Sequence, residues 1–465
     1  MGNLEYTLKI NIKLKEPVHR GKTVEKELSL NELLPQGLAG VVDEHSFVME
    51  ELTTEGAEPV VLQFSSDIHD RLPYIPPVRP LKEAPIGAFP KAFGTNLRYS
   101  CKEQGAELAR SKGTFTWFLR PQKSLERIFV LHFSVAQDGE FYQAPYSPFN
   151  FVVVRPDNRV SPVRQFPSVE LAPHISPDYK LNTTIDQKLF STYQYNPEFT
   201  KPYFYPVIGP SGVEITTLGK DHDPGNTHPH HKSLWIGHQS VNGVNFWEQW
   251  PGNGQIVHRG FNKLEDGPLF GCMEESNTWE RAGRVYAYET RNVKTYKTGA
   301  DYEMMDFTIT MEPENSGMFA GDCVIGKNVW GFLAVRLKPS MIPTVGGGEI
   351  TNSRGMVNED QVIWESAEWC DISGPATAEE WNGVAIFDTP TNASFPTYWH
   401  CKNDGFICTS FSNRQDFVIR RGEKLVVKYR IYIHKGNSKQ GGVGEAFFDY
   451  ASDYGMTVGT PTWCK

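Results

Sequence analysis

The chain has 465 residues, of which 39% are hydrophobic and 12% aromatic, with 41 glycines and 32 prolines. This composition is typical of a globular protein rich in turns, and the length predicts two domains. The formal net charge of -9 argues against binding nucleic acid or acidic membranes through bulk electrostatics, since that attraction needs excess Lys and Arg. No run of apolar residues approaches the roughly 18 that a membrane-spanning helix needs, so we expect no membrane partner.

The N-terminal residues alternate between polar and apolar types and lack the apolar core of a secretory signal. We therefore expect a cytoplasmic protein, or a periplasmic or secreted one whose leader has been removed. The seven cysteines are scattered and form no CxxC pair, which favours reduced thiols over a disulfide framework.

Short runs of alternating polar and apolar residues, broken by Gly, Pro and Asn, recur along the chain and predict β-strands. The clearest of these runs lie at residues 6–14, 113–121, 126–135, 301–313 and 424–434. Helical periodicity is confined to three short segments, at residues 28–34, 103–111 and 441–455. We therefore expect a mostly β fold with few short helices.

Residues 155–178 contain five prolines and little alternation, which predicts a linker between two domains. Before it, we expect residues 1–154 to form an N-terminal β-sandwich. After it, we expect residues 179–465 to form a larger antiparallel β-sandwich that carries the functional site.

Histidines are concentrated in one part of the second domain. Six of the thirteen fall within residues 222–258, namely His222, His228, His230, His231, His238 and His258. Imidazole transfers protons near neutral pH and binds transition metals, so this segment predicts a site. The alternative is that these histidines lie on solvated strand faces or in a hydrogen-bonded polar core.

A divalent metal ion bound by His228 and His230 is one form that such a site could take. The two residues flank Pro229 and can converge, whereas His231 points the other way. His238 would lie about 26 Å from His230 along a strand, so these two cannot bind one ion together. A histidine network without metal is the alternative, because the spacing matches no standard zinc motif. No other cofactor is expected.

Residues 241–261 predict a hairpin whose turn lies at residues 251–255. Folding about this turn sets Glu248 opposite His258, where the carboxylate could orient the imidazole as a general base. An ordinary cross-strand charged pair is the alternative, and a register slip of one residue would separate the two side chains.

The strand expected at residues 424–434 carries two different faces. Its apolar face faces the core, and its other face carries Lys428, Arg430, Tyr432 and His434. A cation, a phenol and an imidazole at intervals of ~7 Å could neutralise an anion, abstract a proton and return it. The alternative is a solvated outer face of the sheet.

Tryptophan is frequent in the second domain, at Trp235, Trp247, Trp250, Trp364, Trp369, Trp381 and Trp399. Sugar rings present apolar CH faces that stack on indole, while Asn, His and Asp bind their hydroxyls. Packing in the hydrophobic core is the alternative explanation for any one tryptophan.

Several of these segments, taken in order, resemble the bacterial PmoA-like family. The matching blocks are residues 228–247, 256–261, 367–375, 384–400 and 429–437, and the resemblance covers roughly residues 200–440. The family name suggests methane oxidation, but that chemistry belongs to a membrane-embedded copper protein and is not expected here. Members look like partners in bacterial carbohydrate breakdown, with a fold similar to the galactose-mutarotase-like β-sandwich.

The resemblance carries over to particular positions of this chain: His228, His230, His231, His238, Asn242, Trp247, His258, Asp371, Trp399, His400, Arg430 and His434. Two departures stand out. Asn245 occupies a position where the family pattern has Asp, and Cys401 and Lys402 follow His400 where a hydrophobic residue and Arg are expected.

Together these features predict a carbohydrate-active enzyme that cleaves a glycosidic linkage, with lyase-type β-elimination preferred. The expected catalytic residues are His230, His231, His258, Arg430, Tyr432, His434 and Glu248. The expected substrate-binding residues are His238, Asn242, Trp247, Trp399, His400 and Asp371.

Other functions stay open at this point. Hydrolysis would need two carboxylates about 5–10 Å apart, drawn from Glu248, Glu365, Asp371 and Asp388. A noncatalytic carbohydrate-binding protein and an epimerase-like or mutarotase-like protein are further alternatives. The expected partner is a saccharide, and the sequence does not indicate an oligomeric state.

Overall fold

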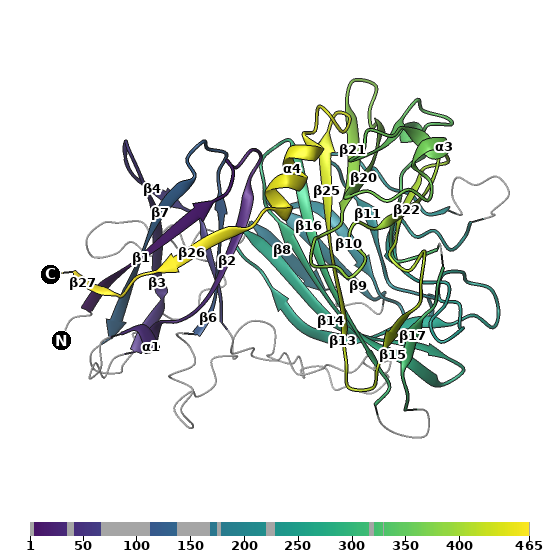
Figure 1. Cartoon of the computed structure of the whole chain (residues 1–465), viewed down its shortest axis with the longest axis horizontal. Helices are drawn as coiled ribbons and strands as arrows, with labels where there is room; N and C mark the ends of the chain where they lie inside the picture. Colours follow the sequence, from purple (N-terminus) through teal and green to yellow (C-terminus); the bar gives the residue numbers. More distant parts are fainter. Residues whose placement is uncertain are drawn as a thin grey trace, which may run out of the picture.

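The chain folds into two β-sandwiches that lie side by side in the computed structural model (Figure 1). The structure describes residues 4–34, 41–66, 112–136, 168–173, 178–219, 228–315, 320–328 and 330–464. Paired strands within this part of the chain are antiparallel, and helices are few and short. The predicted mostly β fold, with a smaller N-terminal sandwich and a larger second one, is confirmed.

The N-terminal sandwich packs two sheets around one hydrophobic core. Sheet 1 contains, in spatial order, β26 (Tyr454–Val458), β1 (Leu4–Leu14), β7 (Glu126–Ala136), β3 (Val41–Thr53) and β4 (Gly56–Val60), with β27 (Thr462–Cys464) also paired to β1. Sheet 2 contains β2 (Lys22–Ser29), β6 (Lys112–Leu119) and β5 (Leu62–Ser66).

The larger sandwich packs two eight-stranded sheets around a second core. Sheet 3 contains β22 (Tyr398–Lys402), β23 (Phe406–Ser410), β18 (Leu333–Arg336), β12 (Leu234–Ile236), β11 (Tyr203–Val207), β10 (Lys188–Gln194), β9 (Lys180–Ile185) and β8 (Val169–Pro173). Sheet 4 contains β13 (Gln255–Glu265), β14 (Phe270–Arg281), β15 (Arg284–Tyr296), β16 (Tyr302–Pro313), β25 (Leu425–Lys435), β21 (Trp381–Phe387), β20 (Trp369–Pro375) and β19 (Glu349–Asn352).

The remaining elements are short. They are the strand pair β17 (Cys323–Ile325) and β24 (Phe417–Ile419), and the helices α1 (Leu30–Leu33), η4 (Pro339–Met341), α3 (Asn358–Val362) and α4 (Val443–Ala451). Helices α1 and α4 lie within the segments predicted at residues 28–34 and 441–455, while the helix predicted at 103–111 lies outside the described residues.

Alternation along the strands explains why they pack as they do. In β25, Val427, Tyr429, Ile431 and Ile433 enter the core between sheets 3 and 4. The alternate residue Tyr432 instead joins a smaller apolar group on the outer face of sheet 4, together with residues of α4. Because side chains of a strand alternate between faces, β25 serves two hydrophobic groups at once.

The linker predicted at residues 155–178 is wrong in part. Residues 169–173 form β8, which pairs with β9 at the edge of sheet 3. Proline is tolerated at the end of an edge strand, so Pro173 does not prevent this pairing. Residues 155–167 and 174–177 lie outside the described part of the chain.

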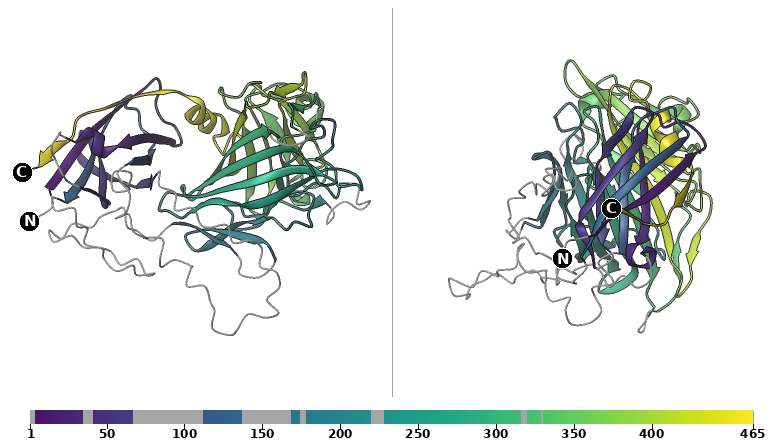
Figure 2. Two further views of the ribbon diagram at one scale, coloured as in Figure 1. Left: turned by 90° about the horizontal axis from the view of Figure 1, so that it is seen from below. Right: turned by 90° about the vertical axis from the view of Figure 1, so that its left-hand side faces the viewer.

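The prediction that residues 179–465 all belong to the second domain is also wrong at its end. After α4, the chain returns to the N-terminal sandwich, where β26 and β27 pair with β1 (Figures 1 and 2). The two ends of the chain therefore share sheet 1. The sequence did not predict this return, because β26 and β27 directly follow α4 of the second domain. Strand pairing depends on which sheet has a free edge and not on distance along the chain.

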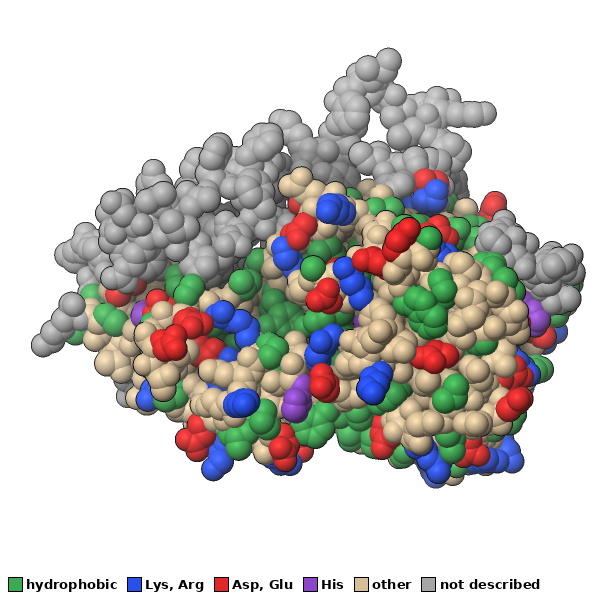
Figure 3. Space-filling model, turned by 90° about the horizontal axis from the view of Figure 1, so that it is seen from above, with side chains coloured by type: hydrophobic (Ala, Val, Ile, Leu, Met, Phe, Trp, Pro, Cys, Tyr) green, Lys and Arg blue, Asp and Glu red, His purple; other side chains and the backbone are tan. Residues whose placement is uncertain are grey.

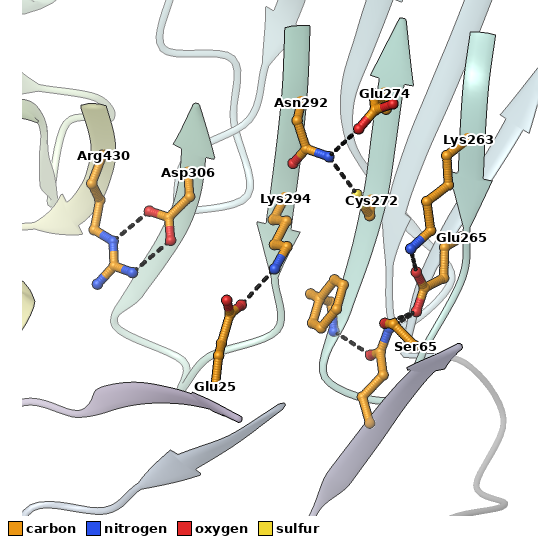
Figure 4. A network of polar contacts seen from close by, with 12 residues as sticks. Glu25, Ser65, Lys263, Glu265, Cys272, Glu274, Asn292, Lys294, Asp306 and Arg430 are labelled. Atoms are coloured by element: carbon orange, nitrogen blue, oxygen red, sulfur yellow. Dashed lines mark hydrogen bonds and ion pairs between the residues drawn. The ribbon is translucent and has the colours of Figure 1, made fainter. Parts of the chain in front are cut away.

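Polar contacts connect the two sandwiches where sheet 2 meets the outer face of sheet 4 (Figure 4). Lys294 Nζ donates to Glu25 Oε1 at 2.5 Å, and Ser65 Oγ donates to Glu265 Oε1 at 2.5 Å. The rings of Phe118 and Tyr296 pack edge to face nearby, with centroids 5.7 Å apart. This contact covers the outer face of sheet 4 around Glu265, Lys294 and Tyr296.

Asp449 of α4 connects this helix to the segment before β2. Its buried carboxylate accepts hydrogen bonds from the backbone N–H groups of His19, Arg20 and Gly21 at 2.6–3.1 Å. Replacing Asp449 by alanine leaves these donors without their acceptor. We expect the free energy of unfolding, measured by chemical denaturation, to fall by roughly 2–3 kcal/mol.

Asp453 provides a matched control for this substitution. Its side chain is 83% exposed and forms an ion pair with Lys15 at 3.2 Å. Asp453→Ala is expected to change the free energy of unfolding by less than about 1 kcal/mol. Equal effects of the two alanine variants would contradict the role given to Asp449.

Three further findings concern both sandwiches. Within the described residues, no helix is long and apolar enough to cross a membrane. The six cysteines of this part of the chain are free, in agreement with the prediction of reduced thiols. On the face drawn in Figure 3, acidic and basic side chains are intermixed over both sandwiches.

Candidate functional site

A row of side chains crosses five strands on the outer face of sheet 3. Strand pairing aligns Tyr203 with Trp235, Trp235 with Ala334, Ala334 with Cys408, and Cys408 with His400. Directly opposed residues of antiparallel strands project to the same side of a sheet. The row therefore brings Trp235 and His400 to one surface, on the side away from the core between sheets 3 and 4.

Residues of neighbouring loops, among them His228, His230 and Trp247, add further rings to this row. We call the resulting group the histidine–tryptophan cluster; it contains His228, His230, His231, Trp235, Trp247, Trp364, His400 and Phe406. His231 stacks on Phe406 with centroids 4.7 Å apart and lies 4.7 Å from His230. His400 lies 5.0 Å from Phe406 and stacks on Trp364 at 4.6 Å.

Burial favours the neutral form of the imidazoles of His230, His231 and His400. Desolvation lowers the pKa of His230 and of His400 to about 3, with Lys201 adding to the effect at His230 and Lys402 at His400. Desolvation also lowers the pKa of the Lys201 ammonium to about 7. Lys201 donates to the backbone oxygen of Trp247 and lies 5.6 Å from the centroid of its ring.

Two imidazole nitrogens of the cluster are buried without a partner. Neither His230 Nδ1 nor His400 Nδ1 has a hydrogen bond to any described residue, although both side chains are less than one tenth exposed. A buried polar atom without a partner costs about 1–3 kcal/mol. Such atoms are expected where a ligand completes the hydrogen bonding.

Arg336 joins the cluster to a carboxylate. Its Nη1 lies 2.8 Å from His231 Nδ1, so the guanidinium donates and the imidazole accepts. Arg336 Nη2 also lies 3.4 Å from Asp404 Oδ2, whose side chain is 41% exposed. This leaves His231 with its proton on Nε2 and holds a permanent positive charge beside His230.

The cluster and both large sheets, except for β8, lie in a region that matches a sequence family. The family of unknown function DUF6807 matches residues 180–447, more than half of the chain. The chain belongs to the DUF6807 family. The family description does not mention the PmoA-like family, so that resemblance stays a prediction.

Further comparisons add little to the family match. No curated protein matches the sequence significantly. Among solved structures, one similar chain is a protein in glycosyl hydrolase family 38 from Enterococcus faecalis, with 9% sequence identity and a TM-score of 0.35. The match covers 97% of this chain and 47% of that one, so the chain spans about half of the length of that structure.

The DUF6807 region contains every residue that the sequence predicted for the site, but the structure brings only some of them together. The cluster unites the predicted residues His228, His230, His231, Trp247 and His400. Sequence analysis missed Lys201, Arg336 and Phe406, and it named Trp364 only among the tryptophans that could stack on a sugar. The strand register, which aligns β18 and β23, brings Arg336 and Phe406 to the cluster, whereas Lys201 and Trp364 reach it from segments outside these strands.

Three of the predicted substrate-binding residues serve the fold. His238 is fully buried; Ser240 N–H donates to its Nδ1 at 3.0 Å, and its Nε2 contacts Ser412 Oγ at 2.8 Å. Asn242 has φ 49° and accepts from Val324 N–H at 2.6 Å. Trp399 lies in the core between sheets 3 and 4, opposite in direction to its neighbour His400.

The predicted pairing of Glu248 with His258 is wrong. Strand β13 pairs with β14 and not with the segment before it, and His258 Nδ1 lies 2.7 Å from Glu275 Oε2. The side chain of Asn245 accepts from the N–H groups of Trp247 and Glu248 and thus closes a local turn. Such side-chain bonds compete with strand pairing, so the expected hairpin does not form.

The predicted catalytic face of β25 is covered and does not meet the cluster. Arg430 forms a bidentate ion pair with Asp306 at 2.6 and 2.7 Å (Figure 4), and burial raises the pKa of Tyr432 to about 12. His434 is fully buried, with Nε2 2.8 Å from Asp371 Oδ2. These residues lie on the outer face of sheet 4 beneath α4, whereas the cluster lies on the outer face of sheet 3.

The carboxylates proposed for hydrolysis are dispersed. Asp371 pairs with His434 on sheet 4, and Glu365 pairs with Arg354 at 3.4 Å near the surface. Asp388 is fully buried and accepts from two backbone N–H groups and from Asn392. Glu248 accepts from Asn245. Each carboxylate has a separate local partner.

The expected metal site at His228 and His230 lacks a third protein ligand in the described part of the chain. The two ring centroids lie 5.8 Å apart. Among the residues that the structure describes, no group of three or more His, Cys, Asp or Glu side chains could hold a metal ion. His222, the other histidine of this segment, lies outside the described residues.

The buried neutral histidines predict a loss of stability in acid. Below pH ~6.5 an unfolded histidine binds a proton, whereas His400 in the folded chain stays neutral down to its pKa of about 3. The free energy of unfolding should therefore fall as pH decreases from 6.5, by about 1.4 kcal/mol per pH unit for each such histidine. The slope of the free energy of unfolding against pH, measured between pH 6 and 5, should be smaller by this amount in His400→Phe than in the wild type. Parallel curves for the two proteins would contradict the pKa given to His400.

Proposed function

We propose that the chain is a carbohydrate-active enzyme that cleaves acidic glycosides by β-elimination at the histidine–tryptophan cluster. The observation that carries the proposal is the pair of buried, unpartnered nitrogens, His230 Nδ1 and His400 Nδ1. They lie among indole and phenyl rings, which stack on the CH faces of sugars. A saccharide would fill the missing hydrogen bonds and cover the rings at once.

The charge of the cluster favours an acidic sugar. The positive charges of Lys201, Lys232 and Arg336 all lower the pKa of His230, and burial makes their effect stronger. A uronic acid carboxylate would relieve this repulsion. Its arrival would also raise the pKa of His230 towards neutrality, because a nearby negative charge favours the protonated imidazole. Binding of an acidic substrate would thus create the base that the reaction needs.

Elimination assigns a role to each of these groups. His230 takes the proton from the carbon next to the substrate carboxylate, and Arg336 holds the charge that develops on the carboxylate oxygens. The electron pair then forms a carbon–carbon double bond as the glycosidic C–O bond breaks. Lys201, with a pKa of about 7, gives a proton to the departing oxygen. The products are one fragment with an unsaturated uronate at its nonreducing end and one fragment with a new reducing end.

The engagement of Glu248, Glu365, Asp371 and Asp388 with four different partners favours elimination over hydrolysis by those carboxylates. Inverting and retaining hydrolysis both need two carboxyl groups about 5–10 Å apart across one bond. In the described residues, each of the four carboxylates already has its own hydrogen-bond or ion-pair partner.

The proposal is tested with purified protein and a panel of uronate-containing oligosaccharides. Elimination produces an unsaturated uronate, which absorbs in the ultraviolet, at the same rate as new chain ends appear. New reducing ends without this absorbance would indicate hydrolysis and overturn the proposal. Binding without any cleavage, weakened in His230→Ala, would indicate a noncatalytic carbohydrate-binding protein instead.

A further inference from the structure

A second group of polar residues lies between sheets 3 and 4 of the larger sandwich. The proposed reaction gives these residues no role. His258 of β13 and Glu275 of β14 form a dyad, with Nδ1 and Oε2 2.7 Å apart. The Glu275 side chain is fully buried, whereas 12% of the His258 side chain is exposed. A carboxylate at Nδ1 fixes the imidazole proton there and leaves Nε2 as a hydrogen-bond acceptor.

A buried network holds Glu275 in its ionised form. Tyr193 OH donates to Glu275 Oε1, Asn277 Nδ2 donates to the same oxygen at 2.9 Å, and Arg291 Nη1 lies 3.5 Å from it. Burial raises the pKa of Glu275, but Arg291 and His258 outweigh this effect and lower it overall. Buried ionic networks are weak evidence of a role in stability, so another role is worth seeking.

Aromatic rings frame the exposed edge of the dyad. The His258 ring lies 4.6 Å from that of Tyr195 and 4.5 Å from that of Phe261, which meet each other edge to face at 5.1 Å. The register of β13 shifts between His258 and Gly260. Bulges of this kind redirect side chains and are frequent beside binding sites.

Two polar atoms of the network have no partner. Arg291 Nη2 and Asn277 Oδ1 are both buried and have no hydrogen bond to any residue that the structure describes. Asn277 lies directly opposite His258 in the strand register, and Arg291 lies opposite Glu275. All four side chains therefore share the inner face of sheet 4. The histidine–tryptophan cluster lies on the outer face of sheet 3, so sheet 3 separates the two groups.

We propose that the His258–Glu275 dyad is a second binding site, which takes a neutral sugar ring. The ring lies against Tyr195 and Phe261, and one of its hydroxyls donates to His258 Nε2. A neutral sugar is favoured over an acidic one because Glu275 and Glu289 outnumber the single guanidinium of Arg291. The proposal does not depend on the reaction assigned to the cluster, because no residue is shared between the two sites.

The experiment follows the ring carbon and proton signals of histidine by NMR in the full-length protein. The His258 signal is identified by its absence in His258→Gln. The probes are methyl glycosides of neutral hexoses, deoxyhexoses and pentoses, with methyl glucuronoside as the acidic comparison. At least one neutral glycoside should shift the His258 signal in a saturable way, and the glucuronoside should not.

Two variants locate the effect. Glu275→Gln keeps the shape of the side chain but removes its charge, and it should weaken binding of the active probe roughly tenfold, since hydrogen bonds supported by an ionised group are the stronger ones. His230→Ala changes only the cluster and should leave the titration unchanged. The proposal is overturned if no neutral glycoside shifts the His258 signal, or if the shift disappears in His230→Ala. If a variant loses elimination activity but the His258 titration is unchanged, the result bears on the function proposed for the cluster and not on the second binding site.

Discussion

Replacement of His230 by alanine is expected to lower kcat for elimination on the order of 10²–10⁴-fold, the usual contribution of a positioned general base. The substitution removes a side chain that is 6% exposed and whose Nδ1 has no partner among the described residues. The initial rate of ultraviolet absorbance on a uronate oligosaccharide measures the effect. Free imidazole added to the variant should restore part of the rate, because the cavity left by the substitution accepts a base of the same shape.

His132→Gln is the matched control for this experiment. His132 lies on β7 of the N-terminal sandwich, and its Nε2 contacts Glu50 Oε2 at 3.1 Å. The control should retain the wild-type rate and should not respond to imidazole. A rate of His230→Ala within about threefold of the wild-type rate would contradict the general-base role, because loss of a general base should lower the rate at least about 10²-fold.

Arg291→Met is expected to cause the largest loss of stability, about 3–5 kcal/mol in the free energy of unfolding. The guanidinium lies 2.6 Å from Glu289 Oε1 and 3.5 Å from Glu275 Oε1, and all three side chains are at most 1% exposed. Its removal leaves two buried carboxylates without the cation that offsets their desolvation. Chemical denaturation at neutral pH measures the change.

Two comparisons make the Arg291 experiment specific. Arg259→Met breaks an ion pair with Glu280 whose side chains are 48% and 21% exposed, and should cost less than about 1 kcal/mol. Adding Glu275→Gln and Glu289→Gln to Arg291→Met should recover much of the lost stability, because the uncompensated charges are then absent. A triple variant as unstable as Arg291→Met would show that packing, and not charge, determines the loss.

Local pattern was enough to predict most strands of the fold. Alternation predicted β1, β6, β7, β16 and β25 near their observed bounds. It also placed Arg430, Tyr432 and His434 on one face of β25, as the structure has them. What covers that face was not predictable, because α4 and residues 19–22 reach it through contacts between distant parts of the chain.

The candidate site shows the same division. The density of histidines in residues 228–258 and the neighbouring tryptophans indicated the right segment. The predicted partner of His258, Glu248, was wrong. The turn made by Asn245 keeps Glu248 out of the sheet, and β14 supplies Glu275 instead. Lys201 and Arg336 carried no signal of their own, since a single Lys in a loop or a single Arg in a strand is ordinary.

By itself, the sequence determined the periodicity of each strand, and therefore which side chains share a face and which faces are apolar. Only the tertiary structure decided which faces meet. Strand order in sheet 3 aligned Trp235 with His400 across segments separated by more than a hundred residues, and the return of β26 joined the two chain ends in sheet 1. The physical reason is that alternation depends on neighbouring residues, whereas strand pairing and burial depend on the free edges and apolar surfaces of the whole chain.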